Sequence, residues 1–412
     1  MVGGGIAGSA LAAVLARHGV ATTLLEQQQD YRDRVRGEYL SVWGVAELQR
    51  MRLAEAMFAT DGSVVKWRVP YDEAWSTQTA LGSARDNSRI LGSVPGAFCG
   101  SHPAACGALS QAAERAGATF IRGVGDVRVS LGAQPQVCYQ TNGAERRLRC
   151  RIVVGADGRQ STIRQQASIP LRAAAVTHLI TGLLVDDIAE WPQDTSVSGT
   201  QGDVMFLVFP QGGARLRLYF CTSPDQRERF AGPGGTRRFL AEYGQLTCLP
   251  GAGAVTAARP IGPCATFASN DTWTESPVAP GVALIGDAAG YNDPIIGQGL
   301  ASALRDARIL AELLLEQSEW DANRLAIYSA ERRERMRRLR FIASLVSALQ
   351  TDFTPGAMER RAHFYDRLRA GEEPALRAAV GATSAGPETV PPELLTQRMR
   401  TCISGAPAAL SV

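Results

Sequence analysis

The N-terminal stretch Met1–Ala16 reads MVGGGIAGSALAAVLA and contains the pattern G-x-G-x-x-G at Gly3, Gly5 and Gly8. An Ala/Leu run of helical composition follows, and a second apolar stretch ends at Glu26. In a dinucleotide-binding βαβ unit, the first glycine permits a tight turn, the second lets the backbone approach a pyrophosphate, and the third lets helix and strand pack closely. An acidic residue about 20 positions later accepts a ribose hydroxyl. We therefore predict such a unit, with a short first strand because only two residues precede the first glycine.

A second turn lies within Ile152–Arg164, which reads IVVGADGRQSTIR. Its β-branched start predicts a short strand, and the pair Asp157-Gly158 follows it. A D-G turn alone is common. Here Ser161 and Arg164 extend it into a longer pattern.

A third motif occupies Gly281–Ala307, which reads GVALIGDAAGYNDPIIGQGLASALRDA. A predicted strand leads into Asp287, Pro294 follows, and a helix with regularly spaced apolar residues begins around Gly297–Leu300. A carboxylate after a strand can hydrogen-bond a polyol, and backbone amides at a helix start can hold an anionic ring edge.

The composition excludes several other classes of protein. The 412 residues carry a net charge of +3, from 43 basic and 40 acidic side chains, which gives no strong attraction to nucleic acid. The eight cysteines form no C-x-x-C pair, so we predict no metal site. The arginine-rich run 332–338 is interpreted as a solvated helix face. We find neither a signal peptide nor an apolar run of about 18 residues, and therefore expect a cytoplasmic protein without a membrane span.

In their order and spacing, the three motifs resemble the class A flavoprotein monooxygenases, the family of para-hydroxybenzoate hydroxylase, from Gly3 to about Arg340. The resemblance implies an α/β fold, with a Rossmann-like FAD-binding domain, an inserted β-sheet substrate domain and a C-terminal helical region. It also implies a set of FAD-contacting residues: Gly3, Gly5, Gly8, Glu26, Arg36, Asp157, Gly158, Asp287, Pro294, Gly297, Gln298, Gly299 and Leu300.

The resemblance also assigns roles to these residues. The first three glycines would cradle the FAD pyrophosphate, and Glu26 would bind the adenosine ribose. Arg36 resembles the family's arginine near the flavin, and Asp287 the residue that binds the ribityl chain. The D-G pair resembles a motif that serves both FAD and NAD(P)H, and segment 294–300 would line the isoalloxazine.

Three positions depart from the family pattern. His102 stands where the family often has an arginine, Gly290 where a histidine is common, and Ala301 where aromatic hydroxylases frequently have asparagine. We expect the FAD fold to survive these changes. They make a simple phenol a less certain substrate and favour a bulkier one.

The motifs also suggest domain boundaries. We expect an FAD-binding domain at 1–70, 96–170 and 276–330, a substrate domain at 71–95 and 171–275, and a C-terminal helical region at 331–412. The alternation in Arg215–Tyr219 predicts a half-buried sheet in the substrate domain. Three aromatic residues there are candidate pocket residues: Phe206, Phe209 and Tyr219.

The implied function is that of a monooxygenase. NADPH or NADH would reduce FAD, and O₂ would add to it as a C4a-hydroperoxide. One oxygen atom would then enter an organic small-molecule substrate, a bulky aromatic or isoprenoid compound, as in natural-product tailoring. The cofactor supplies this chemistry, and the sequence identifies no catalytic side chain, no metal and no oligomeric state. Two alternatives stay open: an epoxidase or reductase of the same fold, and a non-catalytic FAD-binding protein. The halogenase signature W-x-W-x-I-P is missing.

Overall fold

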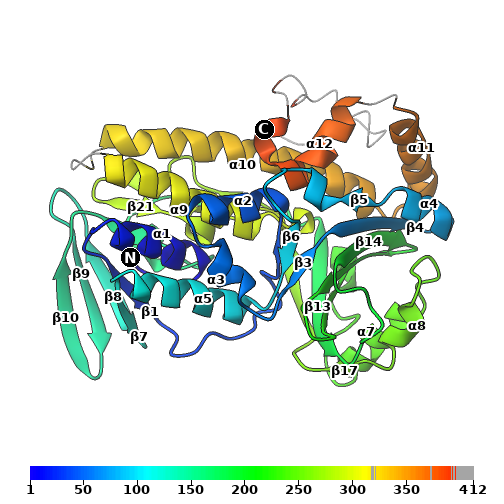
Figure 1. Ribbon diagram of the computed structural model, residues 1–412, viewed down its shortest axis with the longest axis horizontal. Coiled ribbons are helices and arrows are strands. Elements are labelled where there is room, and N and C mark those ends of the chain that lie inside the picture. The colour runs from blue at the N-terminus through cyan, green and yellow to red at the C-terminus, as the bar shows by residue number, and fades with distance from the viewer. Residues whose placement is uncertain (317–319, 321, 372–373, 391, 393–394, 396–412) are drawn as a thin grey trace.

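The computed structural model describes residues 1–316, 320, 322–371, 374–390, 392 and 395. They form a mostly parallel N-terminal sheet and a larger, mostly antiparallel sheet, which lie at opposite ends of the molecule (Figure 1). The long helix α10 (Ala322–Gln350) runs above both. This is the mixed α/β architecture expected from the sequence.

The N-terminal sheet is built around one residue. Val2 forms parallel bridges with Leu25 of β1 (Thr23–Glu26) and with Gly155 of β11 (Val153–Gly155). The predicted short first strand is therefore reduced to this bridge. Further pairings add three strands to the sheet: β7 (Thr119–Arg122) lies beside β1, β21 (Val282–Leu284) lies beside β11, and β20 (Val278–Ala279) pairs antiparallel with β21.

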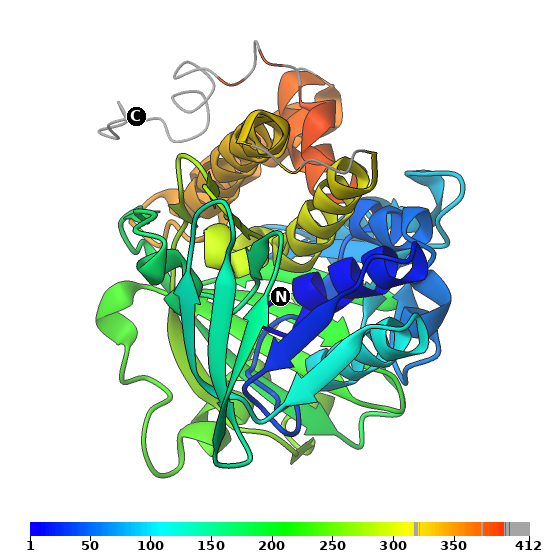
Figure 2. The ribbon, with the colours of Figure 1, turned by 90° about the vertical axis from the view of Figure 1, so that its left-hand side faces the viewer.

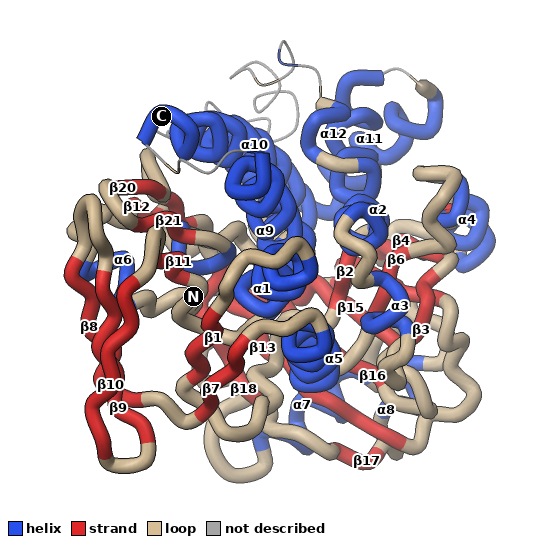
Figure 3. The backbone as a smooth tube through the Cα atoms, turned by 60° about the vertical axis from the view of Figure 1, so that its left-hand side comes forward, coloured by secondary structure: helices blue, strands red, loops and turns tan. Residues whose placement is uncertain are grey.

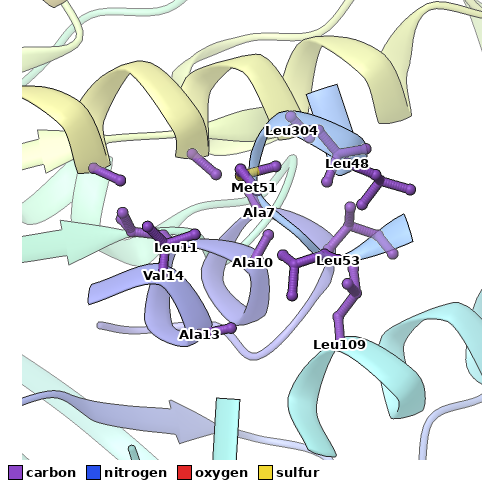
Figure 4. Packing of buried hydrophobic residues seen from close by; sticks show 14 of the residues in the cluster. Ala7, Ala10, Leu11, Ala13, Val14, Leu48, Met51, Leu53, Leu109 and Leu304 are labelled. Atoms are coloured by element: carbon purple, nitrogen blue, oxygen red, sulfur yellow. The ribbon is translucent and has the colours of Figure 1, made fainter. Parts of the chain in front are cut away.

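Helices cover one face of this sheet. Helix α1 (Ile6–Arg17) lies between α5 (His102–Arg115) and α9 (Gly299–Glu316) (Figure 3). Small side chains on α1 let the helices approach closely, and Figure 4 shows Ala7 and Ala10 among leucines of the neighbouring elements. The other face packs against an antiparallel meander of three strands: β8 (Gly125–Ser130), β9 (Gln136–Thr141) and β10 (Ala144–Arg149).

The large sheet has eight strands among the described residues. Its order is β17 (Arg259–Pro260), β13 (His178–Asp186), β16 (Leu216–Thr222), β15 (Val204–Pro210), β14 (Thr195–Gln201), β4 (Trp67–Asp72) and β5 (Arg85–Asp86), with β18 (Ala265–Ser269) also paired to β13. Only the β14–β4 pairing is parallel in this set. Strand β4 belongs to this sheet, although the sequence-based boundary left its first four residues in the FAD-binding domain.

The two faces of the large sheet have different coverings. Side chains on one face pack with α7 (Gly235–Tyr243) and α8 (Ala252–Val255). The opposite face packs against α10 and the 3-10 turn η4 (Pro294–Ile296). Figure 2 views the molecule from the end that carries the N-terminal sheet, which lies with the β8–β10 meander in front of the large sheet.

Helices α11 (Ala357–Ala370) and α12 (Pro374–Ala385) continue the C-terminal region. The remaining helices and strands are short: α2 (Val42–Arg50), α3 (Ala54–Phe58), α4 (Thr77–Gly82), α6 (Thr162–Gln166), β2 (Tyr39–Leu40), β3 (Ser63–Val65), β6 (Ala97–Cys99), β12 (Arg172–Ala173) and β19 (Thr272–Trp273).

The arginine-rich run on α10 is not simply a solvated face, as the sequence suggested. Arg337 is exposed, but Arg332 and Arg335 are buried and form ion pairs with the buried carboxylate of Asp306 on α9. Three positions separate these two arginines, so they lie on the same side of the helix.

Within the described part of the chain, no helix is long and apolar enough to cross a membrane. The same residues include no group of three metal-ligating side chains placed to hold an ion.

Candidate cofactor site

The glycine turn before α1 is tightly packed except at one position. A Cβ on Gly3, whose φ is +103°, would lie 2.2 Å from the carbonyl oxygen of Ala156, and one on Gly8 would lie 2.0 Å from that of Gly3. A Cβ on Gly5 would meet nothing within 4 Å. Gly5 is also the N-cap of α1 and makes no side-chain cap. The turn thus leaves an open space in front of a helix N-terminus, as pyrophosphate binding requires.

Glu26 lies beside this turn, at the end of β1. Its Oε2 accepts a hydrogen bond from the Gly4 amide at 2.7 Å, and its Oε1 accepts one from the Gln28 amide at 2.8 Å. These bonds fix the carboxylate next to the glycine turn, where a ribose of a bound dinucleotide would lie.

The Asp157 carboxylate has a structural task. It accepts hydrogen bonds from the Ser161 hydroxyl at 2.5 Å and from the amides of Thr162 and Ile163 at 2.7 and 3.1 Å, which caps α6. Gly158 follows with a φ of +79°. The predicted contacts of this pair with FAD or a nicotinamide stay predictions.

The turn that carries Asp287 is held by buried charges. The Asp306 carboxylate accepts from the Gly286 amide at 2.7 Å, and Arg332 donates to the carbonyl oxygens of Gly286, Ala289 and Gly290. Although burial alone would raise the pKa of Asp306, the positive charges of Arg332 and Arg335 hold this pKa below its ordinary value. These bonds hold the backbone of the turn and do not involve the Asp287 side chain.

Arg164 links this turn to the D-G motif. Its guanidinium donates to the carbonyl oxygen of Ala288 at 3.0 Å and to that of Arg159 at 3.4 Å. The sequence pattern included Arg164 without giving it this role.

The Asp287 side chain remains about one-third exposed, and it forms an ion pair with Arg159 at 3.3 Å. Arg36 belongs to the same charged cluster. Its pKa is lowered by burial and by the like charges of Arg159 and Arg34, against the attraction of Asp287. Burial together with Arg34 and Arg36 also lowers the pKa of His102. Positive charge thus gathers around one carboxylate, which suits the negatively charged groups of a dinucleotide.

The turn of residues 297–299 at the start of α9, called here the α9 turn, leaves its backbone accessible while the side chain of Gln298 is buried. Gln298 Oε1 accepts from Trp43 Nε1 at 2.6 Å, and its Nε2 donates to the carbonyl oxygens of Ile296 and Thr383 at 2.6 and 2.9 Å. Its buried side chain is therefore engaged by the protein. A Cβ on the exposed Gly299 would meet nothing within 4 Å. Any contact of the turn with a flavin would come from the backbone there and from the partly exposed Pro294, Gly297 and Leu300.

The three aromatic pocket candidates do not share a face. Phe209 and Tyr219 lie on the face that looks toward η4, with ring centroids 6.2 Å apart. Phe206 lies on the α7 face against Tyr243 and is fully buried. Grouping Phe206 with the other two is therefore wrong, because residues an odd number of positions apart on a strand point to opposite faces.

Tyr39, rather than Phe206, is the third aromatic residue beside Phe209 on this face. Its ring stacks on Phe209 with centroids 5.2 Å apart, and it lies 3.0 Å from the position of a Cβ on Gly297. Its hydroxyl is buried without a hydrogen-bond partner. Burial raises the pKa of Tyr39 to about 12. Sequence analysis missed this residue, which is three positions after Arg36 and whose only signal was its proximity to that motif.

The residues present fit an extended dinucleotide cofactor. The open position at Gly5, the carboxylate of Glu26, the partly exposed Asp287 and the open position at Gly299 are the places where pyrophosphate, ribose, polyol and ring would be held. The N-terminal sheet and its helices bring these four positions together from three distant segments.

Comparison with known proteins identifies the class. A family model described as "FAD binding domain" matches residues 1–340, and the chain belongs to this family. It is 27% identical over 360 residues to 3-demethoxyubiquinol 3-hydroxylase of Escherichia coli (strain K12), covering 82% of this chain and 84% of that enzyme. It is also 28% identical to ubiquinone hydroxylase UbiL of Rhodospirillum rubrum over 264 residues. This aligned region covers 60% of this chain and 58% of that protein.

Among solved structures, p-nitrophenol 4-monooxygenase PnpA from Pseudomonas putida DLL-E4 superposes with a TM-score of 0.77 at 18% identity, over 96% of both chains. This likeness concerns the fold. Together with the family match, it confirms the resemblance to the class A flavoprotein monooxygenases.

Proposed function

We propose that this protein is an NAD(P)H-dependent FAD monooxygenase that hydroxylates an apolar aromatic or isoprenoid-type substrate. One atom of O₂ enters the substrate and the other leaves as water, while NAD(P)H supplies two electrons. Reduced FAD supplies the oxygen activation when it is bound. The observation that carries the proposal is the apolar cluster that the large sheet's second face forms with η4, just before the α9 turn, and with α10.

The protein's own residues would bind, orient and exclude water. Gly5, Glu26, Arg36 and Asp287 would hold the cofactor along the N-terminal half, with the α9 turn beside its ring. Buried side chains of η4 and of strands β15 and β16 would keep water from the reacting centre, which such chemistry requires. The hydroxyl of Tyr39 is an unpaired hydrogen-bonding group beside this face.

The charges on this face favour a substrate without a carboxylate. Arg217 is already paired with Asp33 and Glu38, so its positive charge is balanced. The departures from the family pattern and the apolar cluster on this face support a role in natural-product tailoring.

The test begins with the holoprotein. NADPH added without oxygen should bleach a flavin absorption spectrum. The reaction under ¹⁸O₂ should then place one labelled atom in 2-geranylphenol, chosen as an apolar phenol, and none in 4-hydroxybenzoate, its charged counterpart. A reduced double bond without label would instead indicate the reductase. A spectrum that NADPH does not bleach would support the non-catalytic alternative.

A further inference from the structure

The loop 33–38 between β1 and β2 has a strained backbone. Val35 has a φ of +54° and Gly37 a φ of +82°. A positive φ is unfavourable for a β-branched residue, and such conformations persist only where surrounding contacts enforce them. This loop carries Arg36, which the proposed function places at the cofactor.

Four side chains enforce the conformation. Arg217 donates to Asp33 Oδ2 at 2.5 Å, and its Nε lies 3.1 Å from Glu38 Oε1. The Tyr219 hydroxyl lies 2.6 Å from Glu38 Oε2 and 3.1 Å from the Val35 carbonyl oxygen. We call Asp33, Glu38, Arg217 and Tyr219 the latch. It joins the two ends of the loop to one strand, β16, of the large sheet.

Three of the latch residues are buried. The exposed fractions of Arg217, Glu38 and Tyr219 are 2%, 4% and 5%. Burial raises the pKa of Glu38 even though Arg217 and Tyr219 oppose the change. A buried ion pair of this kind contributes little net stability, yet loss of one partner is strongly unfavourable. Its retention therefore fits a role in fixing a geometry.

The large sheet is also shaped to receive the loop. A Cβ on Gly182 of β13 would lie 2.5 Å from the Tyr219 ring and 2.5 Å from Val35 Cγ1. Only glycine leaves room for both side chains at this point. This steric fit is independent of the hydrogen bonds.

Electrostatics explain why a latch is needed. Arg36 lies near Arg34 and Arg159, and both like charges lower its pKa. Arg159 and Arg34 repel Arg36 while the Asp287 carboxylate attracts it, so these charges alone do not fix the loop. The latch fixes it through bonds at both ends of the loop.

We propose that the latch positions the Arg36 loop for the cofactor before the cofactor binds, so that the affinity for FAD depends on side chains of the large sheet. The latch residues are positioning residues, because they act through the loop. This inference rests on the proposed FAD site.

The test compares two buried tyrosines. Tyr219→Phe removes the hydroxyl bonds to the loop. Tyr243→Phe, on the α7 side of the same sheet, removes hydroxyl bonds to the backbone of Leu207 and Tyr219 and leaves the Tyr219 hydroxyl in place. Both variants should lower the Tm. Release of FAD fluorescence on dilution of the holoprotein should show a Kd at least fivefold higher for Tyr219→Phe, and within twofold of wild type for Tyr243→Phe. Equal Kd values for the two variants would overturn the inference.

Two further measurements separate the latch from its alternatives. Arg217→Lys keeps the charge and should retain more FAD affinity than Arg217→Met. Amide hydrogen exchange of segment 33–38 should increase in Tyr219→Phe and not in Tyr243→Phe. A wild-type protein that binds no FAD would refute the proposed function, while unchanged exchange in Tyr219→Phe would refute the latch itself.

Discussion

The two faces of the large sheet are made by the same strands yet differ in chemistry. On the α7 face, Phe206, Phe220 and Phe239 pack with Tyr243 into a buried aromatic cluster. On the opposite face, the alternate residues of β16 are Arg217 and Tyr219, which bond to the loop beside the cofactor site. A shift of one residue along a strand therefore separates side chains that stabilise the fold from side chains that serve the site. The predictions below test this division.

The largest effect is expected where buried charge supports the site. Asp306→Ala would leave Arg332 and Arg335 without their shared carboxylate and should lower the free energy of unfolding by about 3–5 kcal/mol. FAD content should fall too, because the Gly286 amide loses its acceptor. Denaturant unfolding and flavin absorbance measure the two effects. If this variant fails to fold, Asp306→Asn, which keeps an acceptor, tests the same loss of charge.

A loss confined to stability is expected on the α7 face. Phe220→Ala removes a fully buried ring between Phe230, Phe239 and Tyr243, and should cost about 3–5 kcal/mol of unfolding free energy. The Kd for FAD, measured on the folded fraction, should stay within twofold of wild type. A folded Phe220→Ala protein with much weaker FAD binding would contradict the division between the faces.

At Gly5 we expect weaker FAD binding with little change in stability. Its φ of −71° is open to alanine and no atom lies within 4 Å of the new Cβ, so Gly5→Ala should change the unfolding free energy by less than about 1 kcal/mol. The methyl group would occupy the space in front of α1, and the Kd for FAD should rise at least tenfold. Gly107→Ala on α5, where a Cβ also meets nothing, is the matched control and should bind FAD normally.

A smaller, pH-dependent effect is expected at Asp271. Burial, reinforced by the neighbouring charge of Asp293, raises its pKa from 3.8 to about 6. The folded state therefore holds a proton that the unfolded chain releases, so this group's contribution to stability declines as pH rises from about 4 to 6. Asp271→Asn should remove that part of the pH dependence. Thermal unfolding across this range measures it, and an unchanged profile in the variant would contradict the assignment.

The smallest effect is expected at the surface. Arg229 pairs with Asp203 and Glu242 at a partly exposed site of the large-sheet domain. Arg229→Gln should cost at most about 1 kcal/mol and leave FAD binding unchanged. Denaturant unfolding in low and high salt checks this, and the difference from wild type should shrink as salt is added.

Sequence analysis predicted the parts of the site that depend on local backbone chemistry. Gly3 and Gly8 are required by close approach, and the predicted short strand before them is the pair of bridges that Val2 forms. Phe206 was grouped wrongly although its odd spacing from Phe209 carried the necessary signal. The burial of Arg332 could not be predicted, because its partner Asp306 is on another helix and an arginine-rich run ordinarily favours solvent.

The sequence by itself determined the family and the three glycine-containing turns, because the conformation of a glycine turn and a short strand depends on residues within a few positions. Only the tertiary structure decided which charges are buried and which side chains meet. Glu38 and Arg217 are 179 positions apart and join only because β16 passes under the cofactor loop. Such contacts depend on long-range packing, and local patterns carry no information about which distant partner will balance a buried charge.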